Sequence, residues 1–185
     1  MMTRFIFSFL FGILCLDFLH AQGPEMVIPA PAEVCIADGI YSYSDQPRVK
    51  VIHVGNMGPE EYELKVTSGG VRIKAGSDAG VFYARQTLDQ MTCGGTVKEI
   101  PCCTVKDAPR FPYRGLHVDV SRHFRSVDFL KRQMDVMARF KMNRMHIHLT
   151  DAAGWRLEIK AYPRLTSFAA WRPQHTWKEW RAGKR

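Results

Sequence analysis

The chain has 185 residues, of which 46% are hydrophobic and 24% are charged. That balance is typical of a globular protein and excludes a chain that is disordered throughout. The 26 Lys and Arg residues outnumber the 18 Asp and Glu residues, so the formal net charge is +8. The basic residues are scattered and form no run interleaved with aromatic residues, so we expect no nucleic-acid partner.

Residues 1–21 have the pattern of a secretory signal peptide. Arg4 gives the chain a positive start, residues 5–14 form a largely apolar run, and Ala21 supplies a small residue near the expected cleavage point. The run is too short to cross a bilayer core of about 30 Å. We therefore expect export to the periplasm or the extracellular space and no membrane span. The alternative is a buried N-terminal helix or strand.

Four cysteines remain after removal of such a leader: Cys35, Cys93, Cys102 and Cys103. Export permits a disulfide between them. Their spacing contains no C-x-x-C pair and no His at zinc-finger distance, so a structural zinc is not expected. The sequence leaves their pairing open.

Residues 22–108 predict a small α/β (α+β) domain. Residues 61–66 and 71–74 alternate as strands on either side of a Gly-rich turn, which predicts a hairpin. A helix over 79–91 follows, with Ser77 or Asp78 as its N-cap. The segment 100–112 contains three prolines and is predicted to be a stiff linker.

Residues 109–185 begin a different pattern. An alternating strand signature runs from Leu116 to Val120, and Ser126 is a suitable N-cap for an amphipathic helix that we expect to stop near Asn143. A second alternating strand covers residues 145–149. Strand, helix and strand within about 35 residues predict a βαβ unit with parallel strands.

Polar residues follow both of these strands. The first leads into Arg122, and the second leads into Asp151. Because the carboxyl ends of parallel strands share one edge, where ligands bind, Arg122 and Asp151 are expected to lie side by side. A guanidinium there can pair with a carboxylate while donating to sugar hydroxyls. Aromatic residues that can stack on sugars or form ordinary core follow Asp151: Trp155, Tyr162, Phe168, Trp171, Trp177 and Trp180.

Four stretches of the second part of the chain form a specific pattern: residues 107–124 (DAPRFPYRGLHVDVSRHF), 146–151 (HIHLTD), 154–159 (GWRLEI) and 161–166 (AYPRLT). They closely resemble the β-N-acetylhexosaminidases of glycoside hydrolase family 20. Upstream, residues 61–64 and 79–88 are similar to the small α/β domain that precedes the catalytic barrel in this family.

The resemblance implies an α/β fold: the small N-terminal domain followed by the first βαβ portion of an incomplete (β/α)₈ TIM barrel. It also implies hydrolysis of terminal non-reducing N-acetylglucosamine or N-acetylgalactosamine from glycans, with retention of configuration and no cofactor or metal. The substrate's acetamido oxygen acts as the nucleophile in that family, which departs from the usual two-carboxylate scheme. Arg122 matches the arginine that binds the sugar's outer hydroxyls in that family, Asp151 matches its supporting acid, and His148 lies in the same supporting network.

Three departures from the family pattern stand out. Ala152 and Ala153 occupy positions where the family commonly has an acid and a glutamine. The stretch 41–60 looks too short for the usual extra strand and helix. No Gly-Gly-Asp-Glu stretch, which carries the catalytic Asp-Glu pair, occurs in the sequence. A barrel needs roughly 250 residues, against 72 from Arg114 onward. We therefore expect no catalytic residue in this chain and no hexosaminidase activity from it alone.

Two other functions remain open from the residues. His146 and His148 on one strand face are similar to the metal pair of amidohydrolase barrels, but polar filling of a barrel interior is the favoured explanation, because a metal site would need further ligands that are not visible in the sequence. A non-catalytic module that binds carbohydrate through Arg122, Asp151 and the aromatic loop is the second alternative.

Overall fold

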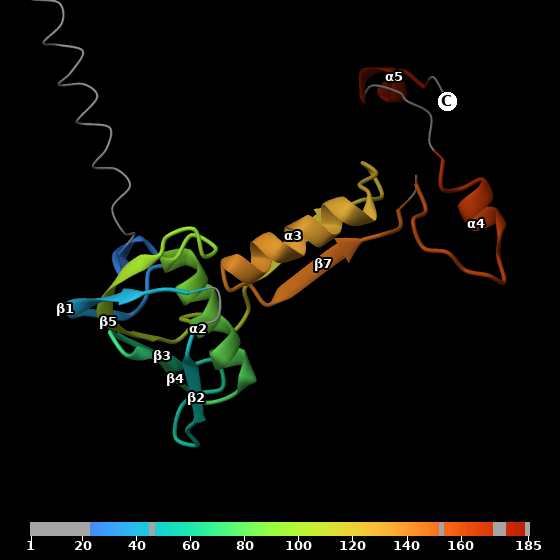
Figure 1. Ribbon diagram of the computed structural model, residues 1–185. Helices are drawn as coiled ribbons and strands as arrows, with labels where there is room; N and C mark the ends of the chain where they lie inside the picture. The colour runs from blue at the N-terminus through green and yellow to red at the C-terminus, as the bar shows by residue number, and fades with distance from the viewer. Residues whose placement is uncertain (1–22, 45–46, 152–153, 172–176, 184–185) are drawn as a thin grey trace, which may run out of the picture. The chain divides into compact units, whose positions relative to one another are not determined.

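A computed structural model describes residues 23–44, 47–151, 154–171 and 177–183. The chain forms two compact units, Met1–Pro112 and Tyr113–Arg185 (Figure 1). The expected signal peptide, residues 1–21, lies outside the described residues. Among the residues that are described, no helix combines the length and apolar character needed to cross a membrane.

A five-stranded sheet forms most of the first unit, in the order β1-β5-β3-β4-β2. Its strands are β1 (Glu33–Ser42), β2 (Val49–His53), β3 (Tyr62–Thr67), β4 (Gly70–Ala75) and β5 (Glu99–Asp107), preceded by a single 3₁₀ turn, η2 (Pro24–Met26). β2 runs parallel to β4, and all other neighbouring strands are antiparallel. β3 and β4 form the hairpin that the sequence predicts.

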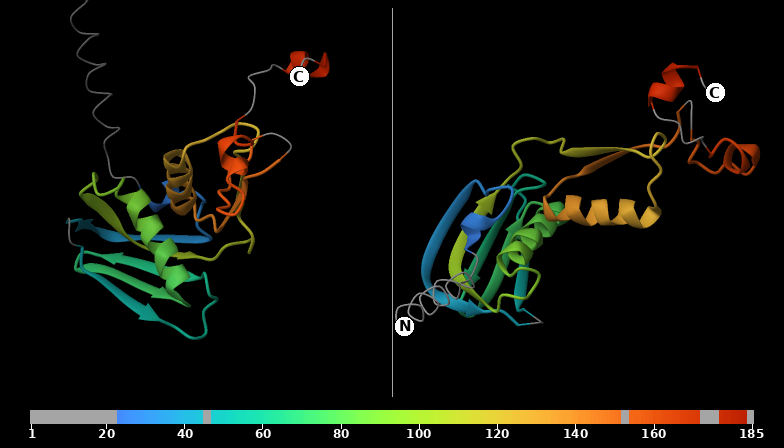
Figure 2. Two further views of the ribbon diagram at one scale, coloured as in Figure 1. Left: turned by 90° about the vertical axis from the view of Figure 1, so that its right-hand side faces the viewer. Right: turned by 90° about the horizontal axis from the view of Figure 1, so that it is seen from above.

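Helix α2 (Asp78–Met91) covers one face of this sheet (Figure 2). The hydroxyl of Ser77 accepts a hydrogen bond from the backbone N–H of Ala79 at 3.1 Å, which confirms Ser77 as the N-cap. Leu88 and Met91 are buried in the core that α2 shares with the sheet. The first unit therefore has the expected architecture of a small α/β domain, with a helix packed on one face of a sheet. The four cysteines of the described residues are free thiols.

β5 corrects the linker prediction for residues 100–112. Residues 99–107 form a strand between β1 and β3, with Ile100, Cys103 and Val105 buried. Pro101 lies opposite Ile40, where the register between β1 and β5 shifts. Because a proline donates no backbone hydrogen bond, strands tolerate it at such an irregularity, and composition alone mistakes the segment for a linker.

The stretch 41–60, predicted to be too short for an extra strand, also departs from expectation. β2 occupies Val49–His53 within it and pairs with β4 at the sheet edge. No helix occurs in the described part of this stretch, residues 41–44 and 47–60.

The second unit begins with the predicted βαβ arrangement. β6 (Gly115–Asp119) and β7 (Arg144–His148) are parallel neighbours, joined through α3 (Val127–Arg139), which runs alongside β7 (Figure 1). The hydroxyl of Ser126 accepts a hydrogen bond from the backbone N–H of Phe129 at 3.2 Å, as expected of the helix N-cap. Two short helices follow, α4 (Arg164–Ser167) and α5 (Trp177–Arg181).

The prediction that Asn143 stops the helix is wrong. α3 ends at Arg139, and Lys141 takes the left-handed backbone conformation with φ +57. Asn143 instead joins the two strands: its side-chain oxygen accepts from the backbone N–H of Arg114 at 3.0 Å, and its own N–H donates to the Arg114 carbonyl at 2.9 Å. These bonds hold the beginning of β7 beside the beginning of β6.

Candidate active site

The carboxyl ends of β6 and β7 form one edge because the strands are parallel. Their register pairs His117 with His146 and, at the last position, Asp119 with His148. Chain segments that leave the two strands therefore start from neighbouring points, and their first few residues are within reach of each other.

Asp119 organises the turn after β6. One carboxylate oxygen, Oδ1, accepts hydrogen bonds from the backbone N–H groups of Ser121 at 3.0 Å and of Arg122 at 2.9 Å. The other oxygen, Oδ2, contacts the guanidinium Nη1 of Arg122. A carboxylate that holds both the backbone and the side chain of Arg122 fixes the direction of the guanidinium.

Arg122, Asp151 and His148 come together, as the sequence predicts. The guanidinium Nη2 of Arg122 lies 2.7 Å from Oδ2 of Asp151, and the same oxygen lies 3.0 Å from Nε2 of His148. The side chain of Arg122 is 61% exposed, so the guanidinium is accessible while it contacts both carboxylates. The role of these residues in sugar binding stays a prediction.

Asp119 and Arg122 both stay ionised at this edge, because each shifts the pKa of the other. Hydrogen bonds from Arg122, first from its backbone N–H and then from its guanidinium, lower the pKa of Asp119 to about 2, although desolvation opposes the shift. The hydrogen bond to Asp119, and then the charge of Asp151, raise the pKa of Arg122 above its ordinary value. A carboxylate and a guanidinium that stay ionised can orient a polar ligand, but neither exchanges a proton near neutral pH.

A further arginine ties the segment after β7 to the turn after β6. Arg156 donates from Nε to the carbonyl of Val120 at 3.0 Å and from Nη2 to the carbonyl of Ser121 at 3.3 Å. The buried hydroxyl of Ser121 donates to the carbonyl of Gly154 at 3.0 Å. Gly154 has φ +82, and a Cβ atom there would lie 2.4 Å from the Ser121 carbonyl oxygen, so only glycine fits this contact.

Three imidazoles lie together on β6 and β7. The ring of His117 is 4.6 Å from that of His146 and 6.3 Å from that of His148, measured between centroids. Within the described part of the chain, no group of three or more His, Cys, Asp or Glu side chains has a geometry that could hold a metal ion. The described structure therefore adds no support to the metal-dependent alternative.

The aromatic residues after Asp151 are only partly described. Tyr162, Phe168 and Trp171 are exposed, whereas Trp155 is half-buried. The side chains of Trp177 and Trp180 are outside the description. Exposed rings are compatible with stacking on sugars, and that contact stays a prediction.

Comparison with protein families accounts for both units. The model described as "Glycosyl hydrolase family 20, domain 2" matches residues 30–108, and that described as "Glycosyl hydrolase family 20, catalytic domain" matches residues 111–183. The chain belongs to glycosyl hydrolase family 20.

Two curated relatives illustrate the similarity. A "Beta-hexosaminidase" of Akkermansia muciniphila is 38% identical over 161 residues, which cover 84% of this chain and 31% of that protein. An "N,N'-diacetylchitobiase" of Vibrio harveyi is 46% identical over 109 residues, covering 59% of this chain and 12% of that protein.

A solved family 20 structure agrees in fold. The "GH20 Exo beta-N-Acetylglucosaminidase from Vibrio harveyi in complex with N-acetylglucosamine" matches with a TM-score of 0.75 and 29% identity, covering 85% of this chain and 32% of that one. This chain thus spans about a third or less of these family members. Its α/β fold, a mixed sheet and helices shared with TIM-barrel enzymes of family 20, is as expected.

Four residues of the candidate site were not identified from the sequence of this family 20 chain: Asp119, Ser121, Gly154 and Arg156. Asp119 had a usable signal: it ends a strand on the same alternating face as His117, three residues before Arg122. The contacts of Ser121, Gly154 and Arg156 involve backbone carbonyls, so residue types do not reveal them, although the family-like stretch 154–159 contains Gly154 and Arg156.

Proposed function

We propose that this chain forms the N-terminal α/β domain and the first βαβ portion of the catalytic barrel of a β-N-acetylhexosaminidase. The enzyme would remove terminal non-reducing N-acetylglucosamine or N-acetylgalactosamine from glycans. The contact between Arg122 and Asp151 at the carboxyl edge of β6 and β7, within a family 20 chain, carries the proposal.

Sugar binding would use the shape and charge of this edge. Arg122 presents donors held in a fixed direction by Asp119 and Asp151, and Asp151 presents acceptor oxygens. A sugar hydroxyl both donates and accepts, so the pair offers complementary partners to adjacent hydroxyls of one pyranose. His148 orients Asp151 through its Nε2 contact.

Bond cleavage would rest on residues that this sequence does not contain. Membership of the family implies that the acetamido oxygen of the substrate attacks the anomeric carbon. A glutamic acid protonates the leaving oxygen, and a neighbouring aspartate stabilises the acetamido group as positive charge develops. In this scheme Arg122 and Asp151 position the sugar for attack and transfer no proton themselves.

Export completes the proposal. The leader-like pattern of residues 1–21 supports secretion to the periplasm or the extracellular space, where glycan substrates occur. Cell fractionation of the producing organism tests it, because recovery of the uncleaved chain in the cytoplasm would refute export.

The test of function uses the complete reading frame and hydrolysis of p-nitrophenyl N-acetyl-β-D-glucosaminide. Arg122→Ala removes charged hydrogen bonds worth about 1.5–3 kcal/mol, so kcat/KM should fall about 10- to 150-fold. The matched control is Arg132→Ala, which removes an exposed arginine from α3 and should change kcat/KM less than about twofold. A complete wild-type protein that hydrolyses neither the gluco- nor the galacto-configured substrate would refute the proposal.

The 185-residue chain provides a second test. Because it contains no Gly-Gly-Asp-Glu stretch, we expect it to release no p-nitrophenol from the same substrate. Release by the purified chain, retained after removal of contaminating hexosaminidase and lost in Arg122→Ala, would show that the catalytic acids lie within it.

A further inference from the structure

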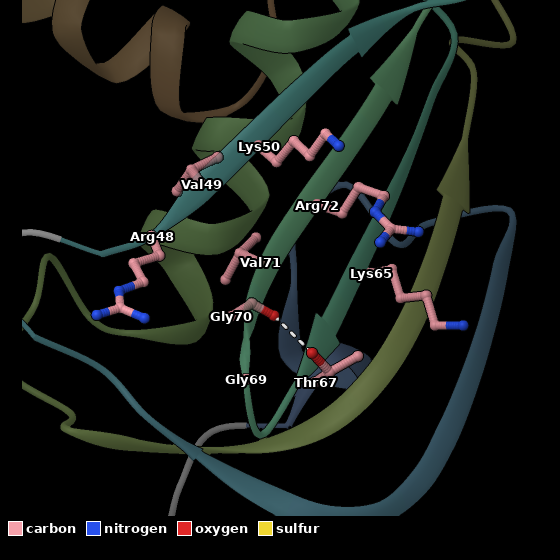
Figure 3. A pocket seen from close by; sticks show the side chains of 9 residues that line it. All are labelled: Arg48, Val49, Lys50, Lys65, Thr67, Gly69, Gly70, Val71 and Arg72. Atoms are coloured by element: carbon pink, nitrogen blue, oxygen red, sulfur yellow. Dashed lines mark hydrogen bonds between the residues drawn. The ribbon is translucent and has the colours of Figure 1, made fainter.

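Three basic residues form a row on the face of the five-stranded sheet that is opposite α2. Arg72 on β4 is paired in register with Lys50 on β2 and with Lys65 on β3, so the three side chains lie on adjacent strands. All three are exposed. Figure 3 shows them extending to the same side of the sheet, while Val49 and Val71 lie on the other side.

The next row along the same strands is built differently. It contains Lys74 and Glu63, joined at 3.0 Å between Nζ and Oε1, and Lys106 and Glu33, joined at the same distance. Cations and carboxylates therefore alternate across the sheet in that row. The row of Lys50, Arg72 and Lys65 contains no acid.

Such a row is unfavourable by itself. Neighbouring strands lie about 4.8 Å apart, so three positive charges stand side by side, and like charges directly opposite each other destabilise a sheet. Within the described part of the chain, these three side chains form no ion pair or hydrogen bond. A bound anion would remove the repulsion, as the carboxylates do in the neighbouring row.

A hollow of about 460 Å³ lies along the row, within the size range of ligand pockets. Besides the three cations, its lining residues are Arg48, Val49, Thr67, Gly69, Gly70 and Val71. The lining includes no aromatic and no acidic side chain. The hollow is thus positively charged and without a platform on which a base could stack.

We propose that the row of Lys50, Arg72 and Lys65 binds an acidic polysaccharide, a chain that carries sulfate or carboxylate groups on successive sugars. Cations at intervals of one strand spacing suit a linear array of anions better than a single ion. Single-stranded nucleic acid is disfavoured because the lining has no aromatic ring for stacking. Insertion into a membrane is disfavoured because the two apolar residues of the lining, Val49 and Val71, direct their side chains to the other side of the sheet.

This proposal does not rest on the hexosaminidase proposal. The row belongs to the first unit, whereas Arg122 and Asp151 belong to the second. A surface that binds an acidic polysaccharide would anchor the protein to that polysaccharide, whatever reaction the second unit supports.

The test measures binding of a fluorescent heparin octasaccharide to the 185-residue chain by anisotropy at about 0.1 M salt. The triple variant that carries Lys50→Gln, Lys65→Gln and Arg72→Gln should bind at least tenfold more weakly. The magnitude of the negative slope of log affinity against log salt concentration should decrease by about 2, as expected for the loss of contacts with a polyanion. The matched control Lys131→Gln, Arg132→Gln, Lys160→Gln removes three exposed positive charges from the second unit. Its affinity should stay within about twofold of the wild type.

Several outcomes would overturn the proposal. Equal losses in the two triple variants would mean that net charge alone attracts heparin. Single-stranded DNA or phosphatidylglycerol vesicles bound more tightly than heparin, with the same dependence on the row, would identify a different partner. Folding is controlled by the single variant Arg72→Gln, which should weaken binding severalfold without lowering the thermal midpoint, because it relieves repulsion in the row.

Discussion

Gly154 offers a sharp test of how the two segments at the candidate site depend on each other. Its φ is +82, its carbonyl accepts from the hydroxyl of Ser121 at 3.0 Å, and a Cβ atom would lie 2.4 Å from the Ser121 carbonyl oxygen and 2.8 Å from Nη2 of Arg156. Gly154→Ala therefore introduces backbone strain and forces Ser121 away. Since Arg122 follows Ser121 directly, the guanidinium should move with it.

The magnitude follows from these contacts. An L-residue in the left-handed region costs about 1–2 kcal/mol, and loss of the hydrogen bond from Ser121 costs about 0.5–1.5 kcal/mol more. Gly154→Ala should thus lower the free energy of unfolding of the second unit by roughly 2–3 kcal/mol. In the complete enzyme, displacement of Arg122 should lower kcat/KM about 10- to 150-fold, as for loss of its charged hydrogen bonds.

Urea unfolding of the 185-residue chain can follow this change through tryptophan fluorescence, because all four tryptophans lie in the second unit. The control is Gly94→Ala in the first unit, where φ is +68 but the nearest atom, Oδ1 of Asp89, is 4.0 Å from the added Cβ. That variant carries strain without a clash and should leave the fluorescence transition and kcat/KM unchanged. If Gly154→Ala alters neither quantity, the contact with Ser121 does not hold Arg122 in place.

Three further variants have expected outcomes. Burial raises the pKa of Tyr62, so the neutral phenol stabilises the fold below pH about 10, and this stabilisation is lost as the pH rises further. Tyr62→Phe removes the hydroxyl and its 2.7 Å hydrogen bond with Thr87, so it should lower the free energy of unfolding by about 1–3 kcal/mol at neutral pH. In thermal scans, the variant should lose less stability at alkaline pH than the wild type does. The lowered pKa of Asp119 stabilises the fold above pH about 4, and this effect disappears as the pH falls toward 2. Asp119→Asn should therefore flatten the acid limb of the stability curve, and an unchanged limb would contradict the contact with Arg122. Ser126→Ala should cost about 1 kcal/mol in urea titrations, because α3 loses its cap.

Local patterns predicted the elements whose alternation or capping is regular. The alternation of β6 and β7 and the cap at Ser126 located the βαβ unit, and Ser77 located α2. β5 was missed because prolines such as Pro101 are typical of linkers. A single sequence gives no sign that an irregularity in the pairing with β1 accommodates this proline. The end of α3 was misplaced because the left-handed residue is Lys141, which has no special preference for that conformation.

The candidate site divides in the same way. The meeting of Arg122 and Asp151 could be predicted because it needs only two parallel strands and their order. The bonds from Arg156 to the carbonyls of Val120 and Ser121 could not, since a backbone acceptor is available at any residue type. Asp119 lies between these cases: its position at the end of a strand was readable, but its role depends on a turn formed by hydrogen bonds to its own neighbours.

The geometry of the site depends on one long-range relation, the register that places Asp119 opposite His148. Arg122 and Asp151 each follow a member of that pair by three residues, and each contacts that member through a local bond. Equal offsets from a registered pair bring Arg122 and Asp151 within 2.7 Å of each other. A shift of one residue would turn Asp119 or His148 to the opposite face of the sheet and separate the guanidinium from its second carboxylate. The bonds between Asn143 and Arg114 at the other end of the strands are therefore as necessary to the site as the residues within it.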